Sequence, residues 1–264
     1  MSSAVGICGG PALAGAAASG DVSVYRNSSD TAALTTTPIA VTWDTTVTER
    51  GTITKQTGNT DIDLSEGGKY LALYNVWSDT GATTGNDRRS LDTYLALDGT
   101  TLPYGFASGY VRDASGEDVA AYNAGAAIID ATAGQNLTVN AVRTDANTGA
   151  ALNVRAGTNG LSLIKLNDDY DYLRVQQTTG ITGISGYTSF TSIPFNLSDE
   201  VDTGSFAFTA SSTATDMNLK GVTGQKFLIT ANVKIEQTAN AGTRQNYEMR
   251  LVRDGVEVPG SRTT

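Results

Sequence analysis

Carboxylates are the side chains of this sequence best placed to do chemistry, because histidine is absent and the only cysteine is Cys8. Without histidine, Ser-His-Asp and Cys-His catalysis, histidine-ligated zinc and histidine pH switching are all excluded. One cysteine makes neither an intramolecular disulfide nor a cysteine metal cluster. The chemistry that remains is hydrolysis by a carboxylate pair, or binding of a hard cation by oxygen ligands.

Two carboxylate arrangements could carry that chemistry. Asp61 and Asp63 lie two residues apart, so they share the outward face of a predicted strand. The cluster NDDYDY, residues 167–172, offers loop oxygens to a calcium ion. It lacks the glycine and distal glutamate of an Asp-rich calcium loop, so a solvated linker is the favoured interpretation. No acid combines an apolar neighbourhood with a partner, and we therefore expect no enzymatic activity, no cofactor and no metal.

Three arginines and the cysteine have simpler interpretations. Arg88 and Arg89 end a loop rich in Gly, Thr and Asp, and Arg244 is the equivalent of Arg88 in the repeat described below. We expect these arginines to be pairing groups on the surface and not an anion site. Cys8 is interpreted as a small buried residue or a tail residue, and a reactive thiol is the less favoured alternative.

The composition favours an all-β protein and excludes two classes of partner. Gly is abundant, with 29 residues among 264, and Thr is frequent, which favours strands joined by many turns. The net charge of -9 repels phosphate backbones, so nucleic acid is not an expected partner. The longest apolar run is far shorter than a membrane span, so no membrane association is expected either.

The first twenty residues, MSSAVGICGGPALAGAAASG, are small and apolar. They have no Lys or Arg ahead of the apolar part, and Gly-Gly-Pro interrupts it, so they do not match a signal peptide. They also lack the Gly-Lys-Ser/Thr that would complete a phosphate loop. We interpret residues 1–20 as an extended arm that is either disordered or laid on a partner.

Segments of the sequence recur in the same order, which indicates a tandem duplication. The hairpin LALDGTTLP at 95–103 matches LVRDGVEVP at 251–259, and GGKYLALYNV at 67–76 matches GQKFLITANV at 224–233. The other matches are DIDL at 61–64 with DMNL at 216–219, Val47 with Val201, VYR at 24–26 with YLR at 172–174, and TTPIAVTWD at 36–44 with TSIPFNLSD at 191–199.

The second copy reaches only the equivalent of Ser108, so its last strands have no counterpart. Three explanations remain open: a longer natural chain, strands supplied by another subunit, or a degenerate half-domain. The expected organisation is an arm at 1–20, a complete jelly roll at 21–166, a linker with the first strand of the second repeat at 167–192, and a partial jelly roll at 193–264.

The repeat has the period of strands, and one of its faces is apolar in both copies. Tyr70, Ala72, Tyr74 and Val76 share that face, which we assign to the core. The opposite faces of this strand and of LDTYLAL, residues 91–97, supply the candidate residues for an oligomer interface, which are Leu71, Leu73, Trp77 and Tyr94. The alternative is that these residues pack beneath a loop or a second sheet.

The order of these strands, with GYVR at 109–112 and GLSLIKL at 160–166, resembles the jelly rolls of the tumour-necrosis-factor and complement globular-head superfamily. It is most similar to the tandem copies of that module in structural proteins of tailed bacteriophages. The resemblance implies a ten-stranded jelly roll that trimerises about a three-fold axis and has no enzymatic activity. The second copy departs from the family because it lacks the closing strand.

The resulting functional hypothesis is a non-enzymatic virion protein, a trimeric capsid decoration or head-fibre protein on the surface of the particle. The arm at 1–20 would attach it to the major capsid protein or to a tail protein. One alternative is a receptor-binding tail-fibre or spike module that recognises a glycan or protein of the host. Others are a secreted bacterial surface trimer and, last, a hydrolase of capsular polysaccharide.

Overall fold

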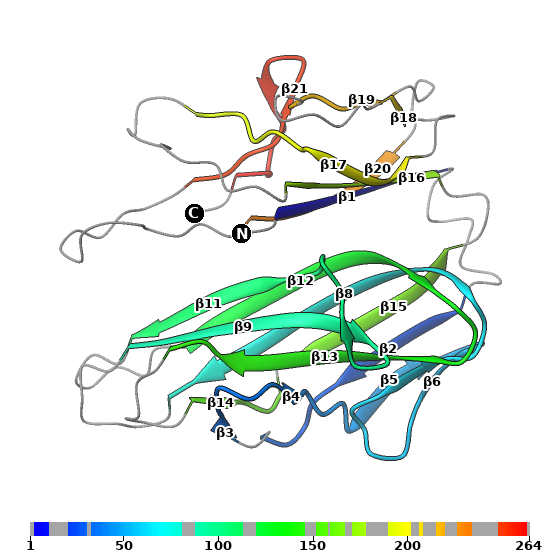
Figure 1. Cartoon of the computed structure of the whole chain (residues 1–264), viewed down its shortest axis with the longest axis vertical. Coiled ribbons are helices and arrows are strands. Elements are labelled where there is room, and N and C mark those ends of the chain that lie inside the picture. The colour runs from blue at the N-terminus through cyan, green and yellow to red at the C-terminus, as the bar shows by residue number, and fades with distance from the viewer. Residues whose placement is uncertain are drawn as a thin grey trace. The chain divides into compact units, whose positions relative to one another are not determined.

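A computed structural model of the chain describes residues 3–10, 21–30, 33–80, 88–112, 120–145, 152–157, 159–166, 171–177, 190–201, 206–207, 215–219, 226–233 and 248–262. None of these residues lies in a helix (Figure 1), so no helix within these ranges could cross a membrane. Met1–Lys234 and Ile235–Thr264 are two separate units.

The first sheet, called here the β8 sheet, is built around its longest strands and is seven-stranded. Its strand order is β3-β14-β8-β15-β2-β5, and β12 pairs with the remaining edge of β8. All of these pairings are antiparallel. The strands are β2 (Val22–Arg26), β3 (Ala33–Leu34), β5 (Thr45–Glu49), β8 (Gly68–Asp79), β12 (Ala120–Ala131), β14 (Leu152–Val154) and β15 (Gly160–Leu166).

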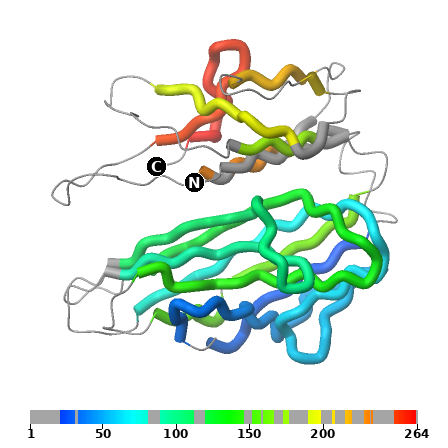
Figure 2. The backbone as a smooth tube through the Cα atoms, viewed as in Figure 1, coloured from blue at the N-terminus to red at the C-terminus, as the bar shows by residue number. Residues whose placement is uncertain are grey.

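The second sheet, called the β9 sheet, is also seven-stranded and antiparallel. Its order is β10-β9-β13-β7-β6, with β11 on β9 and β4 on β13. Figure 2 follows the backbone through both sheets. The strands are β4 (Ile39–Ala40), β6 (Ile53–Lys55), β7 (Ile62–Leu64), β9 (Arg88–Leu97), β10 (Thr100–Thr101), β11 (Ala107–Arg112) and β13 (Gln135–Arg143).

One hydrophobic core fills the space between the two sheets, and the fold is an all-β jelly roll. The predicted core face of β8 is confirmed, because Tyr70, Ala72, Tyr74 and Val76 are all buried in this core. Strand β9 contributes Leu91, Leu95 and Leu97, and β15 contributes Leu161 and Leu163. Period-two alternation therefore gives the correct inward face for the long strands.

Both Asp-Gly turns are tight hairpins, as expected. Asp98 and Asp254 have φ of 46° and 51°, and the glycines that follow have φ of 75° and 79°. Two consecutive residues with positive φ fit the twist of a two-residue hairpin. In each hairpin the returning strand donates a backbone hydrogen bond of 2.9 Å, from Leu102 N to Leu95 O and from Val258 N to Leu251 O.

A third sheet, called the β1 sheet, has four strands in the order β17-β16-β1-β20. Buried Leu173, Val175, Phe195 and Phe206 form a second, smaller core. The sequence predicts only an extended arm at residues 1–20, whereas Ser3–Gly10 is a strand between β16 and β20 (Figure 1). The strands are β1 (Ser3–Gly10), β16 (Asp171–Gln177), β17 (Leu197–Val201) and β20 (Lys226–Asn232), and β18 (Phe206–Ala207) pairs with β19 (Asn218–Leu219).

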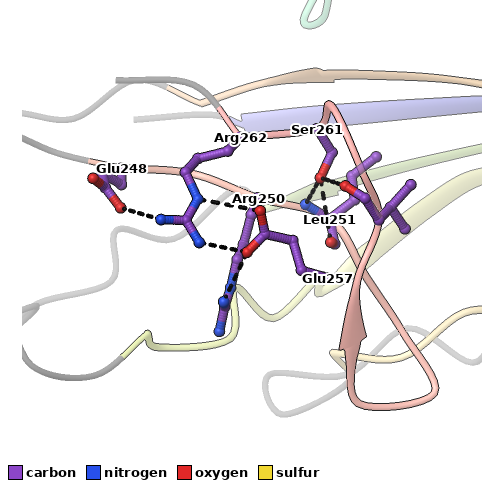
Figure 3. Close-up of polar contacts among 7 residues, drawn as sticks. Glu248, Arg250, Leu251, Glu257, Ser261 and Arg262 are labelled. Atoms are coloured by element: carbon purple, nitrogen blue, oxygen red, sulfur yellow. Dashed lines mark hydrogen bonds and ion pairs between the residues drawn. The ribbon is translucent and has the colours of Figure 1, made fainter.

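The described residues of the second unit form a hairpin of β21 (Val252–Arg253) and β22 (Val256–Glu257). Glu257 accepts hydrogen bonds from Arg250 Nη1 at 3.0 Å and from Arg262 Nε at 3.2 Å (Figure 3). The hydrogen bonds from Arg262 have the largest effect on the Glu257 carboxyl, followed by the one from Arg250. Together they lower its pKa to about 2. Ser261 Oγ donates to Val258 O at 2.7 Å and accepts from Leu251 N at 3.0 Å, which closes the hairpin.

Candidate interaction surface

The outward side of the β8 sheet carries a broad apolar surface, which we call the β8 outer face. Because alternate residues of each strand are buried in the core, the residues between them point away from it. The central part of this face, on the four neighbouring strands β12, β8, β15 and β2, has no charged residue, whereas Lys69, Asp130, Asp79 and Arg26 lie at its ends. The residues of this central part include Val22, Val24, Leu71, Leu73, Asn75, Trp77, Tyr122, Ala124, Ala126, Ile128, Ser162 and Ile164.

Strand register aligns these residues in rows that cross the sheet. Leu71 pairs with Ile128 of β12 and with Ile164 of β15, and Ile164 pairs in turn with Val22. The next row along β8 contains Leu73. Cross-strand neighbours of this kind lie in side-chain contact, so the rows form a continuous surface.

One end of the β8 outer face is already covered within the chain. Leu71 is 4% exposed and forms a buried cluster with Ile128 and Leu166, against which Leu73 and Ile164 pack. Arg174 of β16 donates from Nη1 to Ile128 O at 2.6 Å. Burial of Leu71 and Ile128 therefore does not require a partner molecule.

The opposite end of the face exposes an aromatic pair. The rings of Trp77 and Tyr122 stack with centroids 6.0 Å apart and planes 11° apart. Tyr122 is 65% exposed, whereas Trp77 is half-buried, and its buried indole Nε1 has no hydrogen-bond partner among the residues that the structure describes. An exposed stack of this size on an apolar face is typical of a contact surface.

Loops behind the aromatic pair hold it in place. Trp77 N donates to Asn159 Oδ1 at 2.6 Å, and Asn159 Nδ2 donates to Arg155 O at 2.6 Å. The Arg155 guanidinium pairs with both Asp79 and Asp30. The hydrogen bond from the backbone N–H of Ala156 lowers the pKa of the Asp30 carboxyl most, and the hydrogen bond from the Arg155 side chain lowers it further. Asp30 is therefore charged at neutral pH and can pair with Arg155.

The outward side of the β9 sheet, called the β9 outer face, is polar by comparison. It also has an aromatic stack, in which Tyr94 lies on Phe106 at 5.4 Å, and it exposes Tyr110 by 52%. Polar side chains separate these aromatic residues. The face consists of Ser90, Asp92, Tyr94, Ala96, Ser108, Tyr110, Asn136, Thr138, Asn140 and Val142.

The structure brings three of the four candidate interface residues onto one face. Leu71, Leu73 and Trp77 lie on the β8 outer face, whereas Tyr94 lies on the β9 outer face of the other sheet. Tyr122, Ile128 and Ile164 were not among the candidates, although alternation within AAYNAGAAIIDA, residues 120–131, gives Tyr122 and Ile128 the same facing. A role of any of these residues in an oligomer stays a prediction.

The structure describes one of the two carboxylate arrangements that the sequence singles out. Asp61 and Asp63 flank buried Ile62, so they point outward as expected. Among the described residues, no group of three or more His, Cys, Asp or Glu side chains could hold a metal ion. Residues 167–170 of the NDDYDY cluster lie outside the described residues, as does Arg244.

The expectation that Arg89 lies on the surface is wrong. Arg89 is 0% exposed, and its Nη1 lies 3.9 Å from Asp145 Oδ1. Strand alternation explains this, because Arg89 has the same facing as the core residues Leu91 and Leu95. Asp145 also accepts a hydrogen bond from Ser90 N at 2.9 Å and so joins its loop to the end of β9.

No family model and no curated protein matches the chain. Solved structures do match. Murine APRIL has 18% sequence identity and a TM-score of 0.39, with coverage of 56% of this chain and 100% of that chain. The globular domain of zebrafish complement 1qA has 10% identity, a TM-score of 0.38 and coverage of 56% and 98%. Eiger TNF from S. frugiperda has 14% sequence identity and a TM-score of 0.35, with coverage of 56% of this chain and 94% of that chain.

Proposed function

We propose that this protein is a non-enzymatic structural subunit that forms a homotrimer through its β8 outer face. The observation that carries the proposal is the apolar surface of that face, which ends in the exposed Trp77–Tyr122 stack. A sheet that is apolar on both sides needs cover on both sides. The core covers one side, and Arg174 of the β1 sheet contacts the other side at Ile128.

A second copy of the chain is the occupant that this surface favours. The net charge of -9 makes copies repel one another at long range, so a contact between copies is best placed where charge is absent. The central part of the β8 outer face, from Leu71 to Trp77, has no charged residue and meets that requirement. The resemblance noted from the sequence implies three copies about one axis, in which each apolar face is buried against identical neighbours.

The absence of catalytic constellations in the described residues supports a structural role. Asp61 and Asp63 flank buried Ile62 and point outward. The most strongly buried charged pair, Arg89 with Asp145, links a strand to a loop and faces the core. These groups hold the fold together and bind no substrate in this proposal.

The finer proposal is a virion protein that decorates a capsid or forms a head fibre, on the surface of the particle. Its support is the resemblance to tandem jelly rolls of tailed bacteriophages. Attachment to a capsid or tail protein through residues 1–20 also stays a prediction. Because Ser3–Gly10 pairs with β16 and β20, attachment through those residues would compete with the β1 sheet.

A second candidate function is recognition of a host glycan. Stacked aromatic rings with an exposed face offer a platform on which a sugar ring could pack, and Trp77 with Tyr122 form such a platform. The two functions make opposite demands on the same residues. In a trimer that uses this end of the face the stack is covered, whereas a glycan site needs it open.

Native mass spectrometry of the full chain tests the proposal. We expect a complex of three chains that persists at low micromolar concentration, with a denatured spectrum beside it to give the mass of one chain. A monomer at all concentrations would contradict the trimer. Screening the same sample on a glycan array tests the second function, and binding that is lost in Tyr122→Ala but kept in Tyr110→Ala would favour it. Labelling of natural particles with an antibody to the chain tests the virion location.

A further inference from the structure

We propose that Ser3–Gly10 is a donor strand that closes a second jelly-roll sheet, in the place that β15 occupies in the first. The inference is independent of the trimer proposed above. It assigns a binding site, the slot between β16 and β20, and an occupant, the N-terminal strand of the same chain. Its basis is a comparison of strand order and register between the β8 sheet and the β1 sheet.

The two strands have the same neighbours. Strand β15 lies between β2 and β8 and is antiparallel to both. Strand β1 lies between β16 and β20 and is also antiparallel to both (Figure 1). In the repeat, β16 corresponds to β2 and β20 corresponds to β8. Strand β1 therefore holds the position of β15.

A shared irregularity fixes the correspondence of β16 with β2. In the first copy Val24 pairs with Thr48 and Tyr25 pairs with Thr46, so Val47 is bulged out. In the second copy Arg174 pairs with Glu200 and Val175 pairs with Ser198, so Asp199 takes the place of Val47. The bulge equates Tyr25 with Val175. The sequence matches of VYR with YLR and of Val47 with Val201 are therefore each displaced by two positions.

The sequence repeat fixes the correspondence of β20 with β8 independently of the bulge. GGKYLALYNV and GQKFLITANV equate Tyr74 with Ala231. The strands that precede them also agree. Ile53 pairs with Leu64 in the first copy, and Phe206 pairs with Leu219 in the second, with Leu64 and Leu219 equivalent in the repeat. Such agreement is expected for a second copy of the same fold.

The correspondence of β16 with β2 and that of β20 with β8 give the same equivalent for one residue of β1. Leu161 of β15 pairs with Tyr25 on one side and with Tyr74 on the other. Val5 pairs with Val175 on one side and with Ala231 on the other. Val5 thus has the register position of Leu161. Two residues further on, Ile7 likewise has the register position of Leu163.

The residue types of β1 fit these positions. Leu161 and Leu163 are core residues of the first jelly roll, and their equivalents Val5 and Ile7 are the β-branched residues of Ser3–Gly10. Gly6 corresponds to Ser162 and Cys8 to Ile164. The alternation of apolar residues in SAVGICGG therefore matches that in GLSLIKL. The composition of residues 1–20 alone does not predict this strand.

Closing the sheet in this way removes two exposed edges. Without β1, the facing edges of β16 and β20 would present unpaired N–H and C=O groups, which favour pairing with other chains. A donor strand that supplies both sets of backbone hydrogen bonds is a known mode of strand addition. The slot is accordingly selective for a strand with apolar residues at the positions of Val5 and Ile7.

Disulfide trapping tests the proposal directly, because Cys8 is the only cysteine. Cys8 pairs with Leu228 across β1 and β20. Directly opposite residues of antiparallel strands lie at separations that a disulfide spans. In Leu228→Cys, treated with diamide as the oxidant, we expect an intrachain disulfide that peptide mapping assigns to Cys8. Ile229→Cys is the matched control, because adjacent residues face opposite sides of a strand.

The outcomes are distinct. An intrachain disulfide in Leu228→Cys that is absent from Ile229→Cys supports the donor strand. No disulfide in Leu228→Cys, or equal amounts in both variants, would overturn it. A cross-linked dimer would overturn the assignment to the same chain. None of these outcomes depends on whether the protein is a trimer.

Hydrogen exchange of a second pair of variants separates a local effect on β16 and β20 from a folding defect of the whole protein. Ile7→Asp places a charge at the register position of Leu163, whereas Gly6→Ser introduces the residue type of Ser162. In Ile7→Asp we expect amide exchange at least tenfold faster in β16 and β20, with β2 and β15 unchanged. Gly6→Ser should leave all four strands unchanged. Unaltered exchange of β16 and β20 in Ile7→Asp would count against the donor strand.

Discussion

The β8 outer face and the β9 outer face have the same backbone geometry but opposite chemistry. Each is the outward side of a seven-stranded sheet whose inward side lies in the same core. The β8 outer face carries Leu71, Leu73 and Trp77, whereas the equivalent central strand of the β9 sheet carries Asp92, Tyr94 and Ala96. Alternation gives both sheets their inward face. The outward residues alone distinguish the apolar face from the polar one.

Two exposed tyrosines show the same difference between the two outer faces. Tyr122 and Tyr110 are both exposed, one on each outer face. Tyr122 stacks on Trp77 beside apolar neighbours, whereas Tyr110 pairs with Ser90 across β11 and β9. An exposed tyrosine is not informative by itself. Its surroundings decide whether it belongs to a contact surface, and the following predictions use that difference.

Leu73→Asp is expected to have the largest effect, because it buries a carboxylate in each contact of the proposed trimer. Desolvation of an unpaired charge costs several kcal/mol, roughly 3 or more, which is enough to abolish association. Sedimentation velocity should report monomers. Asn140→Asp, the matched change on the β9 outer face, should remain a trimer. A trimeric Leu73→Asp protein would show that the β8 outer face is not the contact.

Asp145→Ala separates stability of the fold from association. Removal of the carboxylate beside buried Arg89 should lower the free energy of unfolding by about 3 kcal/mol. Chemical denaturation measures this loss. Because Arg89 faces the core, the protein should still form trimers below its unfolding transition. Asp61→Ala serves as a control and should change stability little. Loss of trimers without loss of stability would contradict this role of Asp145.

Comparison of Tyr122→Ala with Tyr110→Ala is a more specific test, with a smaller expected effect. The first change should weaken trimer formation by about tenfold, as expected for an aromatic contact residue worth about 1.4 kcal/mol. The second should leave it unchanged. Dilution followed by native mass spectrometry measures both. Equal effects of the two variants would remove the distinction between the two outer faces.

Asp130→Asn is expected to have a small effect. Asp130 forms an ion pair of 2.8 Å with Lys69 at the end of β12, where both groups retain solvent contact. Pairs of this type contribute about 0.5 kcal/mol. Thermal unfolding should therefore shift by no more than a few degrees, and association should be unaffected. A collapse of the trimer would mean that charge at this end matters more than apolar area.

Acid should weaken the hairpin of the second unit, and the cause is the ion pairs of Glu257. The pKa of Glu257 is lowered to about 2, so its ion pairs stabilise the hairpin above its ordinary pKa of 4.5 and this contribution is lost as the pH falls towards 2. NMR shifts of residues 248–262 should titrate in that range. Glu257→Gln should remove the transition. Its persistence in that variant would assign it to another group.

Much of the jelly roll was predictable from the sequence because its determinants are local. Period-two alternation gives the core face of β8, Asp98-Gly99 gives a hairpin, and GLSLIKL coincides with β15. The pairing of Tyr122 with Trp77 was not predictable, because it depends on the register of strands distant in the sequence. The strand formed by Ser3–Gly10 was missed for the same reason, since its partners lie more than one domain away in the chain.

Hydroxyl-radical footprinting of the native protein tests the central claim most directly. The account predicts that Tyr122 is protected in the assembled state and becomes reactive in Leu73→Asp, whereas Tyr110 is equally reactive in both. This result would place the β8 outer face at the contact between chains. Tyr122 as reactive as Tyr110 in the native assembly would contradict the account.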